Sequence, residues 1–184
     1  MSAARIVMCS MLLLAAACQT PSSAGPGTPG DQIPPELLAP AGAELALRLH
    51  ASGTQNYRCT AGAEGAAQWK LVAPEATLRA TSDPGSPVQG THGAGPSWTL
   101  TDGSGVVGDA SHAKRVPSKE PGAIPWLLLP CKDNGSPGAL QGVTFVQRLN
   151  TQGGAAPATG CESTSVGSEV KVPYSATYLF LRQH

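Results

Sequence analysis

Glycine and proline interrupt this chain so often that a long helix cannot form after its first thirty residues. The 184 residues include 22 glycines and 17 prolines, the two residue types least favourable inside helices. Beyond the N-terminal segment, no stretch keeps a long 3.6-residue apolar period, whereas short alternating runs between turn signals recur. Such punctuation is typical of all-β domains. We therefore predict a mostly antiparallel β-sandwich or β-barrel with short helical turns.

The alternating and apolar runs give the expected elements. Residues 34–38 predict one helical turn, and Pro74 is expected to end the third strand. The expected strands cover residues 45–50, 53–59, 69–73, 88–91, 97–101, a short run around Val106, 124–130, 142–150 and 174–181.

Residues 1–18 have the pattern of an export signal. Arg5 supplies positive charge, residues 6–17 are apolar but too few to span a bilayer as a helix, and a small-residue run ends at Cys18. This pattern predicts a lipoprotein whose Cys18 carries the lipid and whose cleavage site precedes that residue. Cleavage after Ala17 as an ordinary secreted protein is the alternative.

The expected organisation after the signal is a tether followed by one domain. Residues 19–32 form a Gly-, Pro- and Ser-rich linker, and residues 33–184 form a single β domain. The expected location is the outer membrane or cell surface, with secretion in soluble form as the alternative. The lipid at Cys18 makes the membrane one partner.

The charge balance excludes one class of partner. The net charge is zero and charged residues make up 13% of the chain, whereas nucleic-acid-binding domains show a basic excess. We therefore expect no nucleic acid as a partner. The oligomeric state is not determined by the sequence.

Residues 90–108 are the most unusual stretch and hold the main candidate site. They contain six glycines, His92 and Trp98, and such glycine density indicates an unusual backbone path or a close approach. We predict that this stretch lines the functional surface, with His92 and Trp98 nearest any ligand. Alternatively, His92 makes a hydrogen bond to a turn and stabilises the loop.

Two further residues join the candidate ligand-binding set. Trp126 lies in an apolar strand, and with Trp69 and Trp98 it would form a carbohydrate platform or, alternatively, an anchor in the core. Arg148 would clamp a ligand or, alternatively, pair with a carboxylate such as Glu75.

Specific catalytic patterns are missing from the sequence. It has no G-x-S-x-G motif and no Cys or His spacing typical of a metal site, so we predict no cofactor, no metal and no catalytic residue. The preferred function is a cell-envelope binding module for a small molecule, glycan or lipid. The alternatives are an extracytoplasmic enzyme centred on His92, with or without the assistance of a metal, and a purely structural envelope protein.

Ordered motifs along most of the chain resemble the DUF3455 family of exported proteins without an established function. The motifs that carry the resemblance are TQNYRC at 54–59, APEA at 73–76, GTHGAGPSW at 90–98, IPWLLL at 124–129, VTFVQRLNTQGGAAP at 143–157 with GC at 160–161, and VPYSA at 172–176. The resemblance implies a single exported domain. Some fungal members are labelled malate dehydrogenase, but residues 93–96 run into a strand and not into the helix that a dinucleotide site needs.

The same motifs suggest a disulfide. Cys59 and Cys161 both fall within family-like motifs, whereas Cys131 does not. We therefore expect Cys59 and Cys161 to be joined in an oxidising compartment and Cys131 to be exposed or free.

Overall fold

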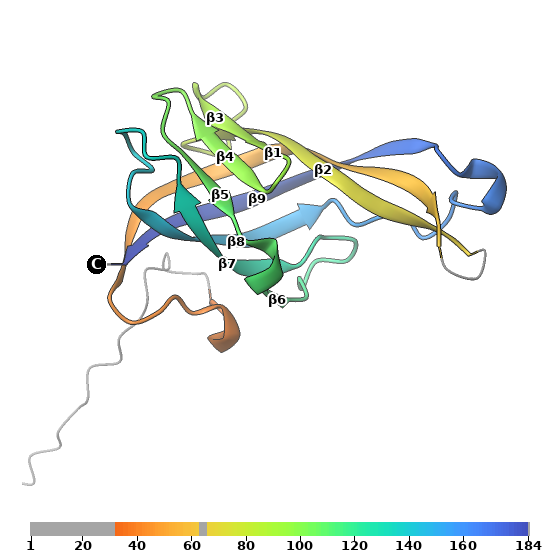
Figure 1. Cartoon of the computed structure of the whole chain (residues 1–184), viewed down its shortest axis with the longest axis horizontal. Coiled ribbons are helices and arrows are strands. Elements are labelled where there is room, and N and C mark those ends of the chain that lie inside the picture. Colours follow the sequence, from red (N-terminus) through yellow and green to blue (C-terminus); the bar gives the residue numbers. More distant parts are fainter. Residues whose placement is uncertain (1–31, 63–65, 184) are drawn as a thin grey trace, which may run out of the picture.

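The structure is a computed structural model that describes residues 32–62 and 66–183, which form one nine-stranded antiparallel sheet (Figure 1). The signal, most of the linker, Cys18 and His184 lie outside the described residues. The strands are β1 (Ala43–Ala61), β2 (Ala67–Arg79), β3 (Val88–Gly93), β4 (Ser97–Leu100), β5 (Gly105–Gly108), β6 (Lys114–Val116), β7 (Trp126–Asp133), β8 (Val143–Gly153) and β9 (Glu169–Gln183). Short 3-10 turns are η1 (Pro35–Leu37), η3 (Ala110–His112) and η4 (Ser163–Ser165).

The sheet closes on itself, so the all-β expectation is confirmed in its barrel form. Its strand order is β5-β4-β3-β2-β1-β9-β8-β7-β6, and β5 also pairs with β7. The edge of β7 is shared: Cys131 pairs with Gly108 of β5, whereas Leu128 pairs with Lys114 of β6. Closure leaves an interior that only inward-facing side chains can fill.

The main core follows the two-residue alternation of the strands. On β9, Tyr174, Ala176, Tyr178 and Phe180 face inward and are all at least 95% buried. Their neighbours in the core come from the other strands of the closed sheet. Alternation of this kind separates an interior face from an exterior face along each strand.

A second, smaller core lies on the outer face under the N-terminal segment. Leu149, Leu179 and Leu181 pack there with Ile33 and Trp126. The side-chain amide of Gln147 donates to the carbonyl oxygen of Leu37 at 2.6 Å. Residues 33–43, including the expected turn η1, therefore cover part of the barrel exterior.

Two expectations about strand boundaries were wrong. Residues 45–50 and 53–59 belong to one continuous strand, β1, and Pro74 does not end β2, which runs on to Arg79. Pro74 lies beside a register shift, since Asn56 pairs with Ala73 but Tyr57 pairs with Leu71. A bulge tolerates proline because the ladder is already interrupted there.

The glycine-rich segment 90–96 contains more regular structure than expected. The expected strand ended at residue 91, whereas β3 continues to Gly93. A Cβ built on Gly90 would lie 2.3 Å from the carbonyl oxygen of Thr99. Only glycine permits this close pairing of β3 with β4.

The cysteine pairing agrees with the sequence-based prediction. Cys59 and Cys161 form a disulfide with a Cα–Cα distance of 5.4 Å, and Cys131 is free and half-buried. Burial, and secondarily the charge of Asp133, raises the pKa of the Cys131 thiol to about 12. Cys131 is therefore a protonated, unreactive thiol at neutral pH.

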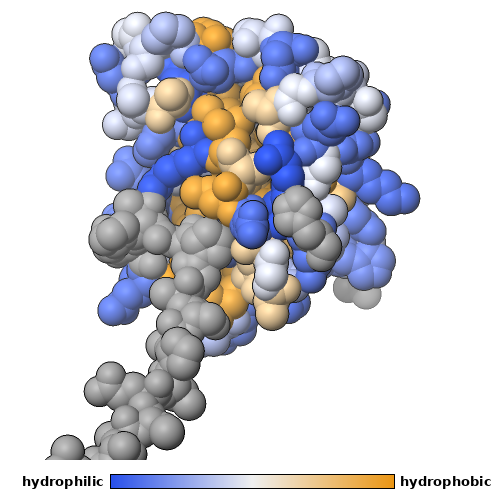
Figure 2. All heavy atoms as spheres, turned by 90° about the vertical axis from the view of Figure 1, so that its left-hand side faces the viewer, coloured by the Kyte–Doolittle hydropathy of each residue, from blue (hydrophilic) through white to orange (hydrophobic). Residues whose placement is uncertain are grey.

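Seen from the left-hand side of Figure 1, apolar residues gather in a strip down the middle of the molecule, flanked by polar residues (Figure 2). Leu38, which follows η1, and Leu45, which is the third residue of β1, remain 47% and 44% exposed. Helices in the described part of the chain are all too short or too polar to cross a membrane.

Candidate functional site

A cavity of about 260 Å3 opens into the barrel, and its lining comes from eight strands. Its polar lining residues are Gln55 of β1, His92 of β3, Trp98 of β4, Arg115 of β6, Arg148 of β8 and Tyr178 of β9. Leu127 and Leu129 of β7 supply an apolar wall, as expected for residues 124–129. Binding sites often combine an apolar lining with a few placed polar groups.

Three of the four predicted ligand-binding residues therefore meet in one cavity. His92, Trp98 and Arg148 all line it, although their positions span 56 residues of sequence, from 92 to 148. Trp126 does not, because it alternates with Leu127 and faces the outer apolar cluster. Trp69 lies elsewhere, with its indole donating to the carbonyl oxygen of Thr159 at 3.0 Å, so the three tryptophans form no common platform.

His92 is a buried member of an aromatic cluster. It is 4% exposed, stacks on Trp98 and meets Tyr178 edge-on at a centroid distance of 5.2 Å. Its Nδ1 lies 2.8 Å from the carbonyl oxygen of Ser97, so Nδ1 carries the proton and Nε2 has the lone pair in the neutral ring. This is the geometry expected of a histidine that stabilises the β3–β4 turn.

Burial also fixes the charge of His92. Loss of solvent lowers its pKa to about 4, and the hydrogen bond to Ser97 opposes that shift only in part, while the charge of Arg148 adds to it. The imidazole is therefore neutral at physiological pH. Among the described residues, Ser97 is the one hydrogen-bond partner of its ring.

Arg148 places a positive charge beside the aromatic cluster. Its Nε and Nη2 donate to the carbonyl oxygen of Pro125 at 3.1 and 2.8 Å. The expected pairing with Glu75 was wrong, because Glu75 accepts a hydrogen bond from the Lys171 ammonium at 2.7 Å. In residues 32–62 and 66–183, no carboxylate forms an ion pair with Arg148.

The positive charge of Arg148 affects the pKa values of three neighbouring tyrosines. Burial raises the pKa values of Tyr57, Tyr174 and Tyr178, and the nearby guanidinium opposes that rise in each case. The phenol of Tyr57 also donates to the carbonyl oxygen of Gly154 at 2.6 Å. All three phenols are therefore neutral, and Arg148 is the half-buried cation of this region, while the exposed Arg115 also lines the cavity.

Two buried N–H donors that line the cavity have no protein partner. Within the described residues, neither the Nε2 of Gln55 nor the Nε1 of Trp98 has a hydrogen-bond acceptor, although both side chains are 98% buried. Buried polar groups are nearly always paired. These donors are therefore positioned for a bound molecule or an ordered water.

Sequence reasoning missed Gln55 and Tyr178 as site residues. The alternation of residues 53–59 does place Gln55 on the same face as Tyr57 and Cys59. A carboxamide on an otherwise apolar face was the available signal. The closure of the barrel, which brings β1 opposite β4 and β8, could not be derived from alternation.

The exposed residues that line the mouth of the cavity are mostly apolar, and Arg115 is the charged one among them. Leu71 and Val72 of β2 line it and are 51% and 55% exposed, and Pro96 of the β3–β4 turn lines it as well. These side chains form a lip between the solvent and the charged interior. Exposed large apolar side chains beside a cavity are typical of a ligand-contact surface.

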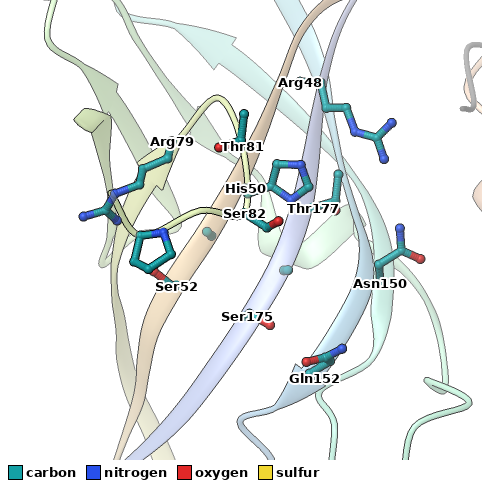
Figure 3. Close-up of a pocket in the computed structure, with 13 residues that line it drawn as sticks. Arg48, His50, Ser52, Arg79, Thr81, Ser82, Asn150, Gln152, Ser175 and Thr177 are labelled. Carbon is teal, nitrogen blue, oxygen red and sulfur yellow. The ribbon is translucent and has the colours of Figure 1, made fainter. Parts of the chain in front are cut away.

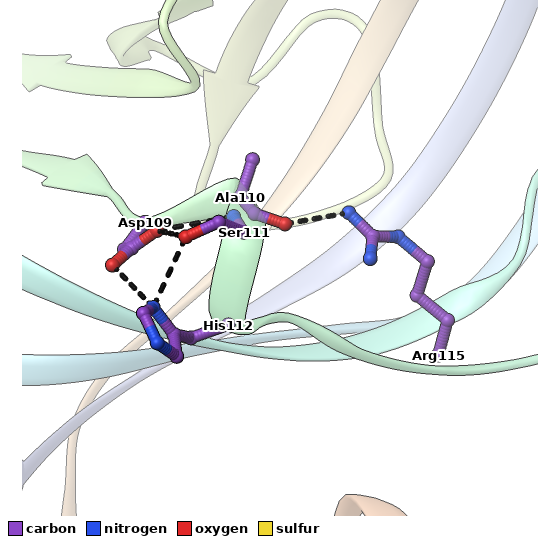
Figure 4. A network of polar contacts seen from close by, with 5 residues as sticks. All are labelled: Asp109, Ala110, Ser111, His112 and Arg115. Carbon is purple, nitrogen blue, oxygen red and sulfur yellow. Dashed lines mark hydrogen bonds and ion pairs between the residues drawn. The ribbon is translucent and has the colours of Figure 1, made fainter.

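The structure also brings together Ser111 and His112 of η3 with Asp109, the residue that caps it, but not as a catalytic triad (Figure 4). The Ser111 hydroxyl at 3.1 Å and an Asp109 oxygen at 2.7 Å both face the same ring nitrogen, Nδ1. A triad requires the two ring nitrogens to serve different partners. Asp109 instead caps the turn by accepting from the backbone N–H of Ser111, and the carbonyl of Ala110 accepts from Arg115.

Within the described ranges, no three His, Cys, Asp or Glu side chains lie close enough together to hold a metal ion.

These features define the class: a single closed antiparallel β domain with a mixed polar and apolar interior cavity. The chain belongs to the DUF3455 family, described as a protein of unknown function, whose profile matches residues 40–182. The resemblance drawn from the sequence motifs is thereby confirmed. No curated protein and no solved structure matches the chain.

Proposed function

We propose that this protein is an exported, lipid-anchored binding module whose barrel interior takes a small organic anion, most simply a carboxylate. The observation that carries the proposal is Arg148, a half-buried guanidinium that lines the cavity without a carboxylate partner among the described residues. Removing a charge from water is costly unless a counter-charge accompanies it. A bound anion would supply that counter-charge.

The hydrogen-bonding groups favour the same ligand class. The bonds to Pro125 use Nε and Nη2 of Arg148, and the guanidinium also interacts with the Tyr178 phenol. Because a guanidinium has five N–H donors, at least one is left for a ligand oxygen. The unpartnered atoms of Gln55 and Trp98 are N–H groups as well. Because all three can only donate, a ligand rich in acceptor oxygens complements them.

The size of the cavity favours a small molecule over a glycan or a whole lipid. Its volume of about 260 Å3 lies just below the roughly 300–1,000 Å3 typical of ligand pockets. The apolar wall of Leu127 and Leu129 and the lip of Leu71 and Val72 suit a compact apolar body attached to the anionic group.

Binding is favoured over catalysis at this site. A histidine is an efficient general base when its pKa lies near the working pH. The pKa of His92 is lowered to about 4, which makes it a weak base.

The test is a thermal-shift and calorimetric screen of small carboxylic acids against their uncharged amides. Carboxylates should raise the melting temperature and the matched amides should not. The variant Arg148→Met should weaken carboxylate binding by about tenfold or more, while its stability stays equal or rises because an unpaired charge has been removed. Arg58→Gln is the matched control, since Arg58 is exposed and pairs with Glu169. Equal binding of acids and amides, or unchanged binding by Arg148→Met, would contradict the proposal.

A further inference from the structure

A second concave site lies on the outer face of the sheet and shares no lining residue with the interior cavity (Figure 3). This groove has a volume of about 460 Å3. Its floor is formed by β1, β9 and β8, and one wall is the β2–β3 loop through Thr81, Ser82 and Pro84. The groove is thus built from parts of the chain that are far apart in sequence.

Strand register aligns polar side chains into two rows across the floor. His50 of β1 pairs with Arg79 of β2 on one side and with Thr177 of β9 on the other. Ser52 pairs with Ser175, two residues further along. Cross-strand partners on one face lie about 5 Å apart, so each row presents successive hydrogen-bonding groups at regular spacing.

A bulge in β8 adds two carboxamides to the groove. The register of β8 against β9 shifts between Leu149 and Gln152. Within it, Asn150 has a φ of 51°, the one positive φ of a non-glycine residue in the described chain. The bulge breaks the alternation of β8, and both Asn150 and Gln152 line the groove.

The lining is cationic and contains no acidic residue. Arg48 and Arg79 both line the groove, and Figure 3 shows their guanidinium groups on opposite sides of it. Arg79 uses its Nε to bind the carbonyl oxygen of Ser86 at 3.1 Å, which holds the β2–β3 loop and leaves both terminal nitrogens for a ligand. Burial, and then the charge of Arg48, lowers the pKa of His50, so His50 is neutral and adds hydrogen bonding.

We propose that this groove binds an anionic polysaccharide. Positive charges on opposite sides of the groove suit acidic groups spaced along one chain better than a single small anion. The rows of hydroxyl and amide groups between them match the hydroxyls of sugar rings, which both donate and accept. Arginine suits this role because its fork of N–H groups binds sulfate, phosphate and carboxylate oxygens.

The test uses polymers with one backbone and different charge: dextran sulfate, carboxymethyl dextran and neutral dextran. Both charged polymers should bind the full-length protein and neutral dextran should not. The variant Arg48→Gln/Arg79→Gln should weaken binding by about tenfold or more. The control Arg58→Gln/Lys70→Gln makes the same change in net charge outside the groove and should leave binding nearly unchanged.

A second variant separates the groove from general electrostatic attraction. Ser52→Leu fills the floor without altering any charge and should also weaken binding. Equal losses of polymer binding in the arginine variant and its control would overturn the proposal, and so would full binding by Ser52→Leu. Complete displacement of the polymer by inorganic phosphate at low millimolar concentration would also overturn it. Arg148→Met should not affect polysaccharide binding, so this site and the interior site can fail independently.

Discussion

The imidazole of His92 and the indole of Trp98 stack face to face, with ring centroids 4.4 Å apart and planes within 7° of parallel. The two residues are cross-strand partners on β3 and β4, and the edge of Tyr178 contacts both rings. This cluster joins the glycine-rich stretch to β9. It forms the polar, aromatic side of the interior cavity.

Replacing His92 by alanine should destabilise the fold strongly. The substitution removes a buried ring, its stacking on Trp98 and its hydrogen bond to Ser97, a combined loss of about 2–4 kcal/mol in the free energy of unfolding. Chemical denaturation measures it, with the exposed His112→Ala as control. A loss as small as that of the control would show that the cluster does not stabilise the barrel.

Stability should fall as the pH drops from about 7.5 to about 5. The pKa of His92 is about 4 in the folded protein, below the ordinary histidine value of 6.5, so in this range the unfolded chain binds a proton that the folded protein does not. The expected loss is about 2 kcal/mol by about pH 5. His92→Gln should reduce this dependence, and the part that remains includes His50, whose lowered pKa gives a loss of the same sign. Asp109, with a folded pKa of about 2, contributes only at lower pH.

Gly154→Ala should destabilise the protein far more than Gly103→Ala. Both glycines have a φ near +85°, so the backbone strain of about 1–2 kcal/mol is matched. At Gly154 the new Cβ would also lie 2.8 Å from Tyr174 Cβ and 3.1 Å from Gln55 Cγ, whereas at Gly103 nothing lies within 4 Å. Thermal unfolding compares the two, and equal shifts would contradict the close packing beside Gln55.

Removing the disulfide should lower stability by about 2–5 kcal/mol. Cys59 and Cys161 are 102 residues apart, and a crosslink over so long a loop restricts the unfolded chain strongly. The variant Cys59→Ala/Cys161→Ala measures the effect by denaturation. Cys131→Ala is the control and should cost less, since no crosslink is lost.

Cys18→Ser should move the protein from the membrane fraction to the soluble fraction. The prediction rests on the small-residue run before Cys18 and on the flexible linker that follows it. Cell fractionation with detection of the protein checks it, and Cys9→Ser within the same signal is the control. Unchanged fractionation of the Cys18 variant would favour ordinary cleavage after Ala17.

Local patterns in the sequence were sufficient to predict the all-β class, most strands, the 3-10 turn near Pro35 and, through family-like motifs, the pairing of Cys59 with Cys161. These features depend on neighbouring residues: alternation sets the faces of a strand, and glycine and proline end regular structure. The same local reasoning failed at Pro74, because the bulge that accommodates it arises from pairing with β1.

The site depended on contacts between distant segments. Sequence alone selected His92, Trp98 and Arg148, but only barrel closure through β5 and β7 showed that they share a cavity, that Gln55 and Tyr178 join them, and that Trp126 faces outward. Likewise, the partner of the Glu75 carboxylate is Lys171, which lies 96 residues away in sequence. The inward or outward face of a residue follows from local alternation, whereas its partners follow from strand order and register, which are set by the packing of the whole sheet.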